Sequence, residues 1–457
     1  MDVTASKSTS TTHGARPPRV AMVAACPFPA NHGTPAAIRE LAIHLARLGN
    51  EVHVVTYPQA EPIPVDGLHI HRVKVPFYKP GPIGIGPSYE RLLFDAFLVP
   101  KLIQVILRYR IDVIHAHNYE ATIAGWLARL LTRRPLIYNG VTAMADELPS
   151  YGFIKPDRLA SGIGKLLDRT VPRMGDLSMV LSDDLRDYLI SLGNRPDRVL
   201  IVPPGVEMDW LSSGDRARGR GYLELPDEVP TVMYTGALEG FQRIDYLLQA
   251  MVPVAEKVPD AVLVIAGNIK NTKAWELYQS MATELGIAMR VKLVESVPLD
   301  QLPDYLAAAD VTVAPRPSCP GFPVKLLNYM AAGRPIVSFE GSAKSLCHGY
   351  SGYVARNDDV EDFADGIALL LQDRELAEYM GRRAYESLAG VFDWETLGLG
   401  VTEAYRQLIE SRKSYSLSSV SAYFKKSYKP QIMDAKQISA NQIDGKLFYP
   451  SLQEEDL

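Results

Sequence analysis

The amino-acid sequence predicts an α/β protein made of two Rossmann-like, doubly wound domains that face each other across a cleft. The chain has 457 residues, which is more than a single hydrophobic core usually serves. Short β-branched runs alternate with helical patterns in two successive series. The predicted strands are apolar enough to be covered on both faces, as is typical of parallel sheets.

The first series opens as a βαβ unit. A strand is predicted at 19–25 and a helix at 35–48, in which apolar residues recur at the i, i+3, i+4, i+7 spacing until Gly49 ends the helix. Further strands are predicted at 51–56, 112–116, 135–139, 178–182 and 199–202. Together these segments predict a parallel sheet.

The second series predicts strands at 231–235, 261–266, 291–294, 311–314 and 335–339. Between the two series, Pro203–Glu207 and the charged, Gly-containing stretch to about Pro230 have the composition of a hinge. Ligands of open α/β sheets collect beyond the carboxyl ends of the strands, so the expected site is the cleft between the domains.

Composition limits the classes of partner. Apolar residues make up 47% of the chain, charged residues make up 22% and the net charge is −5, so no nucleic-acid partner is expected. Three cysteines, Cys26, Cys319 and Cys347, have no CxxC spacing and predict neither a disulfide framework nor a zinc site. Residues 1–16 lack the apolar segment of a signal peptide, and a cytoplasmic location is expected.

The segment from Pro315 to Val337 predicts a buried strand end, a Pro/Gly loop, a short helix and another strand. The loop contains Gly321 and Phe322, and the helix is expected to begin near Val324. Unpaired backbone N–H groups and the positive helix end can then face an anion. Lys325 adds a positive charge, so the segment predicts a site for a phosphate and a sugar.

The two Rossmann-like series, the Pro203–Val206 hinge and the Lys325–Val337 segment resemble family-4 retaining glycosyltransferases of the GT-B fold. The resemblance covers about residues 18 to 410. It implies transfer of a sugar from a nucleotide diphosphate donor, held mainly by the second domain, to an acceptor held mainly by the first. It implies no metal ion, since cations and helix ends aimed at the leaving diphosphate stabilise the transition state.

The resemblance also assigns the domains. Residues 1–16 are expected to be a disordered leader and 17–203 the acceptor domain. Residues 204–390 are expected to be the nucleotide-sugar donor domain, 391–412 a C-terminal helix that returns to the first domain, and 413–457 a polar tail.

The chain departs from the family pattern at most of its anchor residues. The family Arg is Ala237, and the family Lys falls at Gln242, although Arg243 follows it directly. The two glutamates of the family's E-x7-E pair align with Pro320 and Asn328. No imidazole stands where the family has a His, near Asn139, Val141 and Thr142. Two explanations stay open: a divergent active branch with Arg316, Lys325 and Arg243 as its cations, or a catalytically degenerate GT-B protein that acts as a binding or scaffold subunit.

The predicted site residues follow from this alignment. Lys325, Arg243 and Glu147 are the catalytic candidates, with Glu147 as a base or an orienting group for the acceptor hydroxyl. Donor-binding candidates are Gly33, Thr34, Gly236, Gln242, Val297, Arg316, Gly321, Phe322, Val324 and Asn328. The nucleotide base is expected against the 295–298 loop. Uracil is the favoured base there, and guanine stays possible.

His115 and His117 share one face of a strand, but no third metal ligand accompanies them, so a structural or acceptor-side role is expected.

The acceptor is expected to be a glycan, a lipid-linked sugar or a small molecule. An apolar helix at 89–110 is too short and too interrupted to span a bilayer. A basic helix follows, with Lys155, Arg158, Lys165, Arg169 and Arg173. These two helices either dock on the inner face of a membrane or provide a core helix and a solvated charged face.

Overall fold

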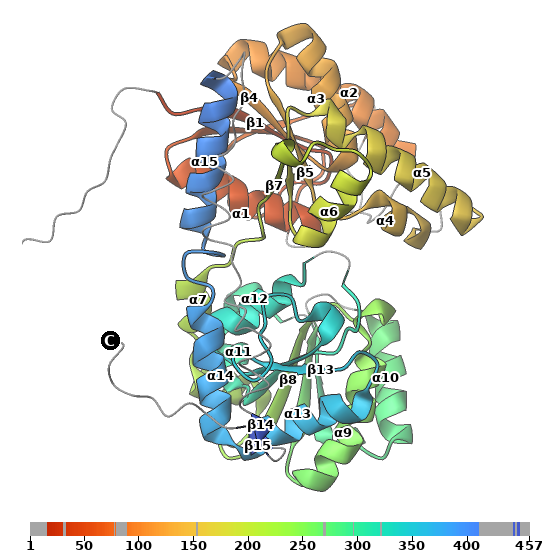
Figure 1. The fold of residues 1–457 in the computed structure, drawn as a ribbon, viewed down its shortest axis with the longest axis vertical. Coiled ribbons are helices and arrows are strands. Elements are labelled where there is room, and N and C mark those ends of the chain that lie inside the picture. The colour runs from red at the N-terminus through yellow and green to blue at the C-terminus, as the bar shows by residue number, and fades with distance from the viewer. Residues whose placement is uncertain are drawn as a thin grey trace, which may run out of the picture. The chain divides into compact units, whose positions relative to one another are not determined.

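A computed structural model gives the fold of the chain (Figure 1). It describes residues 16–30, 33–76, 78, 89–151, 154–267, 271–295, 297–319, 322–410, 442–443 and 446–447. The chain divides into two compact units. The first comprises Met1–Met179, Leu189–Leu200 and Gly398–Ser418, and the second comprises Val180–Tyr188, Ile201–Leu397 and Ser419–Leu457.

The first sheet has the strand order β3-β2-β1-β4-β5-β6-β7. Its strands are β1 (Arg19–Ala24), β2 (Glu51–Thr56), β3 (His69–Arg72), β4 (Val113–His117), β5 (Leu136–Gly140), β6 (Leu177–Val180) and β7 (Val199–Ile201). The pairs β1–β2, β1–β4, β2–β3 and β4–β5 are parallel. The helices of this part of the chain are α1 (Gly33–Arg47), α2 (Tyr89–Tyr109), α3 (Asn118–Thr132), α4 (Met144–Ser150), α5 (Asp157–Thr170) and α6 (Asp183–Ser191).

Helices α2 and α3 cover one face of the first sheet. Leu98 and Leu102 of α2 and Ala124 of α3 are buried in one cluster with Val23 of β1 and Ile114 of β4. This burial confirms the core-helix alternative for the apolar face of 89–110, whereas docking to a membrane stays a prediction. Within the described part of the chain, no helix is both long and apolar enough to cross a bilayer.

The opposite face of the first sheet receives part of the C-terminal helix α15 (Trp394–Glu410). Tyr405 Oη and His115 Nδ1 are hydrogen-bonded at 2.6 Å, and Asn50 Nδ2 donates to Thr402 Oγ1 at 2.9 Å. The portion of α15 from Gly398 onward therefore packs as an integral part of the first unit.

The second sheet has the order β10-β9-β8-β11-β12-β13, and all five strand pairs are parallel. Its strands are β8 (Thr231–Gly236), β9 (Val262–Gly267), β10 (Val291–Val294), β11 (Val311–Ala314), β12 (Ile336–Phe339) and β13 (Tyr353–Ala355). The helices are α7 (Met208–Ser212), α8 (Arg216–Leu223), α9 (Ile244–Lys257), α10 (Thr272–Glu284), α11 (Leu302–Ala308), α12 (Val324–Ala331), α13 (Val360–Gln372) and α14 (Arg374–Glu386).

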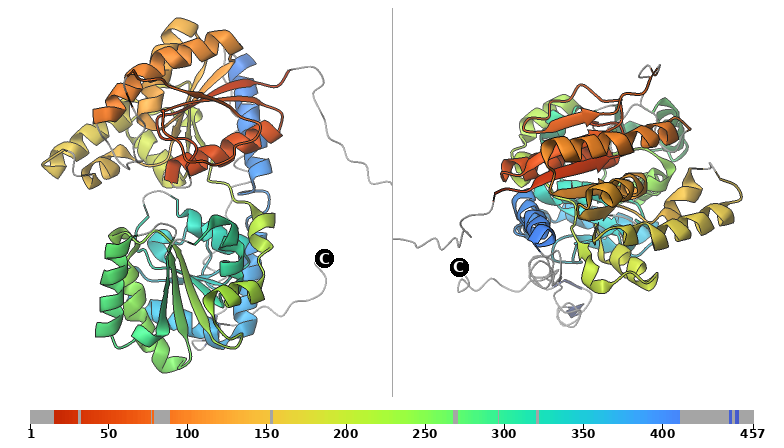
Figure 2. Two further views of the ribbon diagram at one scale, coloured as in Figure 1. Left: turned by 180° about the vertical axis from the view of Figure 1, so that it is seen from behind. Right: turned by 90° about the horizontal axis from the view of Figure 1, so that it is seen from above.

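Helices cover both faces of the second sheet, as a doubly wound fold requires (Figure 2). Val232 and Tyr234 of β8 are buried with residues of α9, α10 and α13. Met233, the residue between them, faces the other side and is buried with residues of α8 and α11. This alternation along β8 fixes which side chains meet each helical layer.

The prediction of a hinge from 203 to about 230 is wrong for 208–223, which forms α7 and α8. Asp215 caps α8 by accepting a hydrogen bond from the Arg218 N–H at 2.8 Å. Arg220 is buried and donates to the Ala308 carbonyl at 3.0 Å, and it pairs with Asp310 at 2.8 Å. A Cβ on Gly219 would lie 2.0 Å from the Asp304 carbonyl oxygen, so this glycine permits close packing on α11. The charges and glycines that suggested a hinge therefore serve tertiary packing.

A second difference concerns Gly33 and Thr34, which the sequence placed in a loop before the first helix. The structure places both in the first turn of α1. The predicted leader, apart from Arg16, lies outside the described residues. The same is true of the predicted tail, apart from the two-residue strands β14 (Gln442–Ile443) and β15 (Lys446–Leu447).

Candidate active site

The second sheet has its topological switch point between β8 and β11. These strands are parallel neighbours, with Val232 opposite Val311, and the strands on either side extend the sheet in opposite directions. The segments that follow Gly236 and Ala314 therefore leave the sheet at the same carboxyl edge. This edge is where open α/β sheets bind their ligands.

Lys325 lies at this edge, in the first turn of α12. Its ammonium donates to Tyr234 Oη at 2.7 Å and to Gln242 Oε1 at 2.8 Å. It also lies 4.0 Å from the centroid of the Tyr234 ring. An ammonium group has three N–H donors, so two have partners among the described residues and a third can serve a ligand.

The electrostatic state of Lys325 is unusual. Burial, together with the nearby Arg316 guanidinium, lowers its pKa from 10.5 to about 7. The partners described for its ammonium are a neutral phenol and a neutral amide. A cation held in this way gains most when an anion enters the site, because the anion supplies the missing countercharge.

Gly236 ends β8 beside this ammonium. Its φ of +128° suits glycine, and a Cβ there would lie 3.3 Å from Lys325 Nζ. Tyr329 of α12 holds the same strand end, since Thr235 N–H donates to its hydroxyl at 2.9 Å. The approach of Lys325 to the strand therefore depends on the absence of a side chain at 236 and on the anchoring of α12 by Tyr329.

Gln242 and Arg243 have different surroundings. Gln242, at the position of the family Lys, is the direct partner of Lys325. The Arg243 guanidinium is bonded to Asp245 at 2.8 Å and lies 3.3 Å from the centroid of the Tyr246 ring. The carboxylate of Asp245 raises the pKa of Arg243. A phosphate contact from Arg243 would have to replace this ion pair, and the contact stays a prediction.

Arg316 follows β11, and its guanidinium lies 4.8 Å from the centroid of the exposed Phe241 ring. Its charge acts on Lys325, so the two cations belong to one site. Asn328 is half-buried one turn along α12, and its side-chain amide has no hydrogen-bond partner among the described residues. Its amide can therefore serve a ligand hydroxyl.

Three predicted residues of the 320–324 segment have different outcomes. Gly321 lies outside the described residues. Phe322 is 8% exposed, and its ring packs 5.6 Å from that of Phe392, so any ligand contact would come from its backbone. Val324 is the exposed first residue of α12, where helical N–H groups have no intrahelical partner.

Val297 lies beyond the carboxyl end of β10. Its N–H donates to the Gly267 carbonyl at 2.9 Å, and its side chain packs beside Met233 and Ala266. The N–H is therefore already occupied, so any backbone contact with a base from this residue would use its carbonyl group.

In the first unit, Gly33 has a φ of +48° at the start of α1. Glu147 belongs to α4, and its carboxylate accepts hydrogen bonds from Thr142 Oγ1 and Tyr151 Oη. The buried Asp168 holds α4 in place by accepting from the Met144 and Ala145 N–H groups at 2.8 and 3.0 Å. Glu147 therefore has a fixed orientation near the end of β5.

His115 and His117 stack on each other with ring centroids 4.5 Å apart. Burial lowers the pKa of His115 to about 3 and that of His117 well below its usual value. Both imidazoles are thus neutral, and the Tyr405 contact gives His115 the structural role that the sequence suggested.

Two residues that shape the candidate site, Tyr234 and Tyr329, carry no signal in the sequence that predicts this role. Tyr234 bonds Lys325, and its own hydroxyl donates to the Ala237 carbonyl at 2.6 Å. Each tyrosine lies in an apolar run and resembles a core residue in the sequence. Their hydroxyl groups find polar partners only when β8 and α12 are packed together.

Comparisons with known proteins agree with this architecture. Residues 32–205 match the family model for the glycosyl transferase 4-like domain, and residues 215–387 match the model for glycosyl transferases group 1. A D-inositol 3-phosphate glycosyltransferase of Nocardia farcinica is 26% identical over 410 residues, covering 85% of this chain and 89% of that protein. The Mycobacterium avium enzyme of the same name is 28% identical over 408 residues, covering 86% of this chain and 95% of that protein.

Solved structures share the fold. Sucrose-phosphate synthase from Thermosynechococcus elongatus superimposes with a TM-score of 0.73 at 20% identity, covering 86% of this chain and all of that one. Anabaena HepE in complex with UDP gives a TM-score of 0.65 at 17% identity, covering 85% of this chain and 99% of that chain. The chain belongs to the family-4 type of GT-B glycosyltransferases, and it is an enzyme of this class.

Proposed function

We propose that this glycosyltransferase is a retaining enzyme that moves a sugar from a UDP-sugar to an acceptor hydroxyl without a metal ion. The observation that carries the proposal is the Lys325 ammonium, which two neutral side chains hold at the carboxyl edge of the second sheet. The acceptor classes are a glycan, a lipid-linked sugar or a small molecule. A donor diphosphate is the anion that this geometry would accommodate.

The charge arrangement supports a role in the departure of the diphosphate. As the glycosidic bond breaks, the leaving oxygen gains negative charge. Lys325, Arg316 and the N-terminus of α12 stabilise that charge more strongly in the transition state than in the ground state. Burial lowers the pKa of Lys325 to about 7, and entry of a diphosphate raises this pKa and secures the protonated form.

The choice of uridine rests on similarity. Anabaena HepE, which has the same fold, is described in complexes with UDP and with UDP-glucose. In this chain, the loop around Val297 offers backbone groups to a base, and Asn328 offers an amide to a ribose hydroxyl. These features are compatible with uridine, and a panel of nucleotides tests the choice.

The acceptor side carries acidic groups. Glu120 at the start of α3 lies within the electrostatic reach of Asp95 and Glu147, with Arg91 as a compensating cation. Burial raises the pKa of Glu120 and of Asp95, so a further negative charge beside them, such as a phosphate monoester, would be disfavoured. We therefore propose a neutral hydroxyl acceptor for this chain, in contrast to the phosphorylated inositol in the names of its relatives.

A scaffold subunit without catalysis is the competing function. Burial of an ammonium without a countercharge costs free energy, which a scaffold has no reason to retain. The Lys325 environment thus favours the active enzyme. Measurements of nucleotide binding and of sugar transfer separate the two functions.

The first experiment is a thermal-shift screen with UDP, GDP, ADP and TDP. A nucleotide at a hundredfold excess over its Kd should add about 2.7 kcal/mol to the free energy of unfolding. Transfer from UDP-sugars to neutral polyols and to D-inositol 3-phosphate is then followed with and without EDTA, and NMR reports the anomer of the product. Absence of a shift with all four nucleotides would favour the scaffold. Preference for the phosphorylated acceptor would refute the acceptor assignment alone.

A further inference from the structure

Four polar side chains gather on one face of the first sheet at its β3 edge. Glu51 and His53 alternate along β2, and His69 and His71 alternate along β3. The parallel register places His53 opposite His69 and Val55 opposite His71. Since side chains at i and i+2 of a strand share a face, all four lie on the same side of this strand pair.

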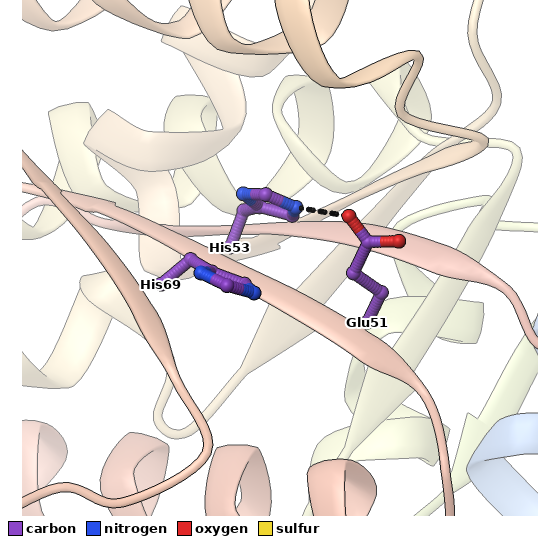
Figure 3. Close-up of side chains that lie close together, drawn as sticks. All are labelled: Glu51, His53 and His69. Atoms are coloured by element: carbon purple, nitrogen blue, oxygen red, sulfur yellow. Dashed lines mark hydrogen bonds and ion pairs between the residues drawn. The ribbon is translucent and has the colours of Figure 1, made fainter.

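The side chains converge closely enough to share one ion. Each of Glu51, His53 and His69 offers a ligand atom, and these three atoms lie within 4.8 Å of one another (Figure 3). His53 Nε2 and Glu51 Oε1 are 3.0 Å apart. The His53 and His69 rings stack with centroids 4.7 Å apart. Only small side-chain rotations would be needed to direct the three atoms at one point.

We propose that Glu51, His53 and His69 form a binding site for a single Zn²⁺ ion, or a similar divalent transition metal, at the β2–β3 edge. Two imidazoles and one carboxylate are a common ligand set for zinc that leaves a fourth position to water. His69 is exposed and Glu51 is half-buried, so the ion can enter from solvent.

His71 would orient His53. Its Nε2 lies 3.0 Å from His53 Nδ1. A carboxylate only accepts, so a neutral His53 ring donates from Nε2 to Glu51 and can accept from His71 at Nδ1. If Nε2 bound a metal, the single proton of a neutral His53 would lie on Nδ1 and be donated to His71 Nε2, and the single proton of a neutral His71 would lie on its Nδ1. Each ring keeps one proton, and His71 becomes the outer partner that fixes the tautomer of the ligand.

The neighbouring charges moderate the affinity. Arg19 Nε donates to Glu51 Oε2 at 3.1 Å, which leaves Oε1 to face the ion. The Arg19 guanidinium partly neutralises the Glu51 carboxylate and repels a divalent cation, so it lowers the affinity of the site for the ion. The alternative to a metal site is a polar cluster in which the four side chains satisfy one another. Direct binding measurements separate these two cases.

The site would be structural rather than catalytic. It lies at the amino ends of β2 and β3, whereas the candidate donor site lies at the carboxyl edge of the second sheet. A bound ion would tie the edge strand β3 to β2. Any ligand that binds the folded state alone stabilises it by mass action, so the ion should raise the melting temperature of the protein.

The test uses full-length, tag-free protein that has been freed of metal by chelation. Isothermal titration with Zn²⁺ should give one equivalent bound, and saturation with zinc should raise the melting temperature. His69→Asn and Glu51→Gln should weaken binding by at least tenfold and remove the stabilisation. His71→Asn should weaken binding about 10- to 100-fold, the range for loss of an outer partner.

Ile70→Val is the matched control, because it alters β3 and keeps the three ligands. It should bind Zn²⁺ like the wild type. Co²⁺ should give the visible absorption of a four-coordinate ion in the wild-type protein but not in His69→Asn. Absence of stoichiometric binding, or equal binding by wild type and His69→Asn, would overturn the proposal. Retention of the wild-type melting temperature by metal-free His69→Asn would show that the variant folds.

Discussion

Replacement of Lys325 by Met tests the central feature of the candidate donor site. The change removes the ammonium and keeps an unbranched side chain of similar length. Two ammonium N–H groups bond Tyr234 and Gln242, which leaves one charge-assisted hydrogen bond for a phosphate oxygen. Loss of one such donor to a developing negative charge typically lowers kcat by about 100- to 1000-fold, or about 3 to 4 kcal/mol.

The pH dependence gives a second, independent signature. Burial lowers the pKa of Lys325 to about 7, so the group is mostly an ammonium below this pH and mostly a neutral amine above it. In the wild type, kcat/KM should be level on the acid side of about pH 7. It should then fall about tenfold for each pH unit above that value, since kcat/KM reports the groups of the free enzyme. This basic limb should be absent from Lys325→Met.

Stability should move in the opposite direction from activity. The folded-state pKa of about 7 lies below the ordinary lysine value of 10.5, so the folded protein binds fewer protons than the unfolded chain between these two pH values. Stability therefore rises with pH across that window, and burial of the charge opposes folding in full below pH 7. At pH 6, the free energy of unfolding of Lys325→Met should equal that of the wild type or exceed it by up to about 1 kcal/mol, after allowance for the partial exposure of the side chain.

The assays are steady-state kinetics from pH 6 to 9 and thermal melts. Lys257→Met is the control, since Lys257 pairs with Asp365 on the surface of the same unit and should keep the wild-type profile. If Lys325→Met kept more than about a tenth of the wild-type kcat, the assignment of Lys325 to the leaving diphosphate would be refuted. A flat wild-type profile between pH 6 and 9 would contradict the lowered pKa.

Three further predictions concern other sites. Arg220→Met should lower the free energy of unfolding by about 2 to 4 kcal/mol, because the buried guanidinium is the donor to the Ala308 carbonyl, while Asp310 keeps Arg216 as a partner. The exposed Arg218→Ala should lower it by about 1 kcal/mol or less. Equal losses in the free energy of unfolding for the Arg220 and Arg218 variants would argue against a special role for the buried guanidinium. Gly236→Ala forces a Cβ to within 3.3 Å of Lys325 Nζ at a φ of +128°, so it should lower stability by about 1 to 3 kcal/mol and raise the KM for the donor. An unchanged KM would place the donor elsewhere. Glu147→Gln should lower kcat by about 100-fold or more, with an unchanged Kd for the donor nucleotide if the carboxylate acts on the acceptor hydroxyl. Calorimetry with UDP and initial rates distinguish this outcome from a general loss of binding.

The fold was predictable because its determinants are local. Buried parallel strands require continuous apolar runs, such as those of Arg19–Ala24 and Thr231–Gly236, and these runs are visible without any tertiary information. The hinge was predicted wrongly between 208 and 223 for the opposite reason. Arg220 and Gly219 resemble hinge residues in sequence, and their role appears only when α8 packs against α11.

Part of the candidate site could also be predicted. The alignment with the family pattern identified Lys325, Gln242 and Gly236, and the structure brings these three residues together. The alignment could not show that Arg243 pairs with Asp245, because that choice depends on the left-handed backbone conformation of Arg243 at the start of α9. Nor could it show that Phe322 turns into the core.

The sequence by itself thus determined the two α/β series, the class of enzyme they imply and the segment that carries Lys325. The tertiary structure decided the protonation behaviour of Lys325, since burial and the Tyr234 hydroxyl come from elements about 90 residues apart in the chain. It also decided that Glu51, His53 and His69 meet, because strand register is a property of paired backbones. Local patterns specify secondary structure, whereas charge states and ligand sets depend on which distant side chains share a small volume.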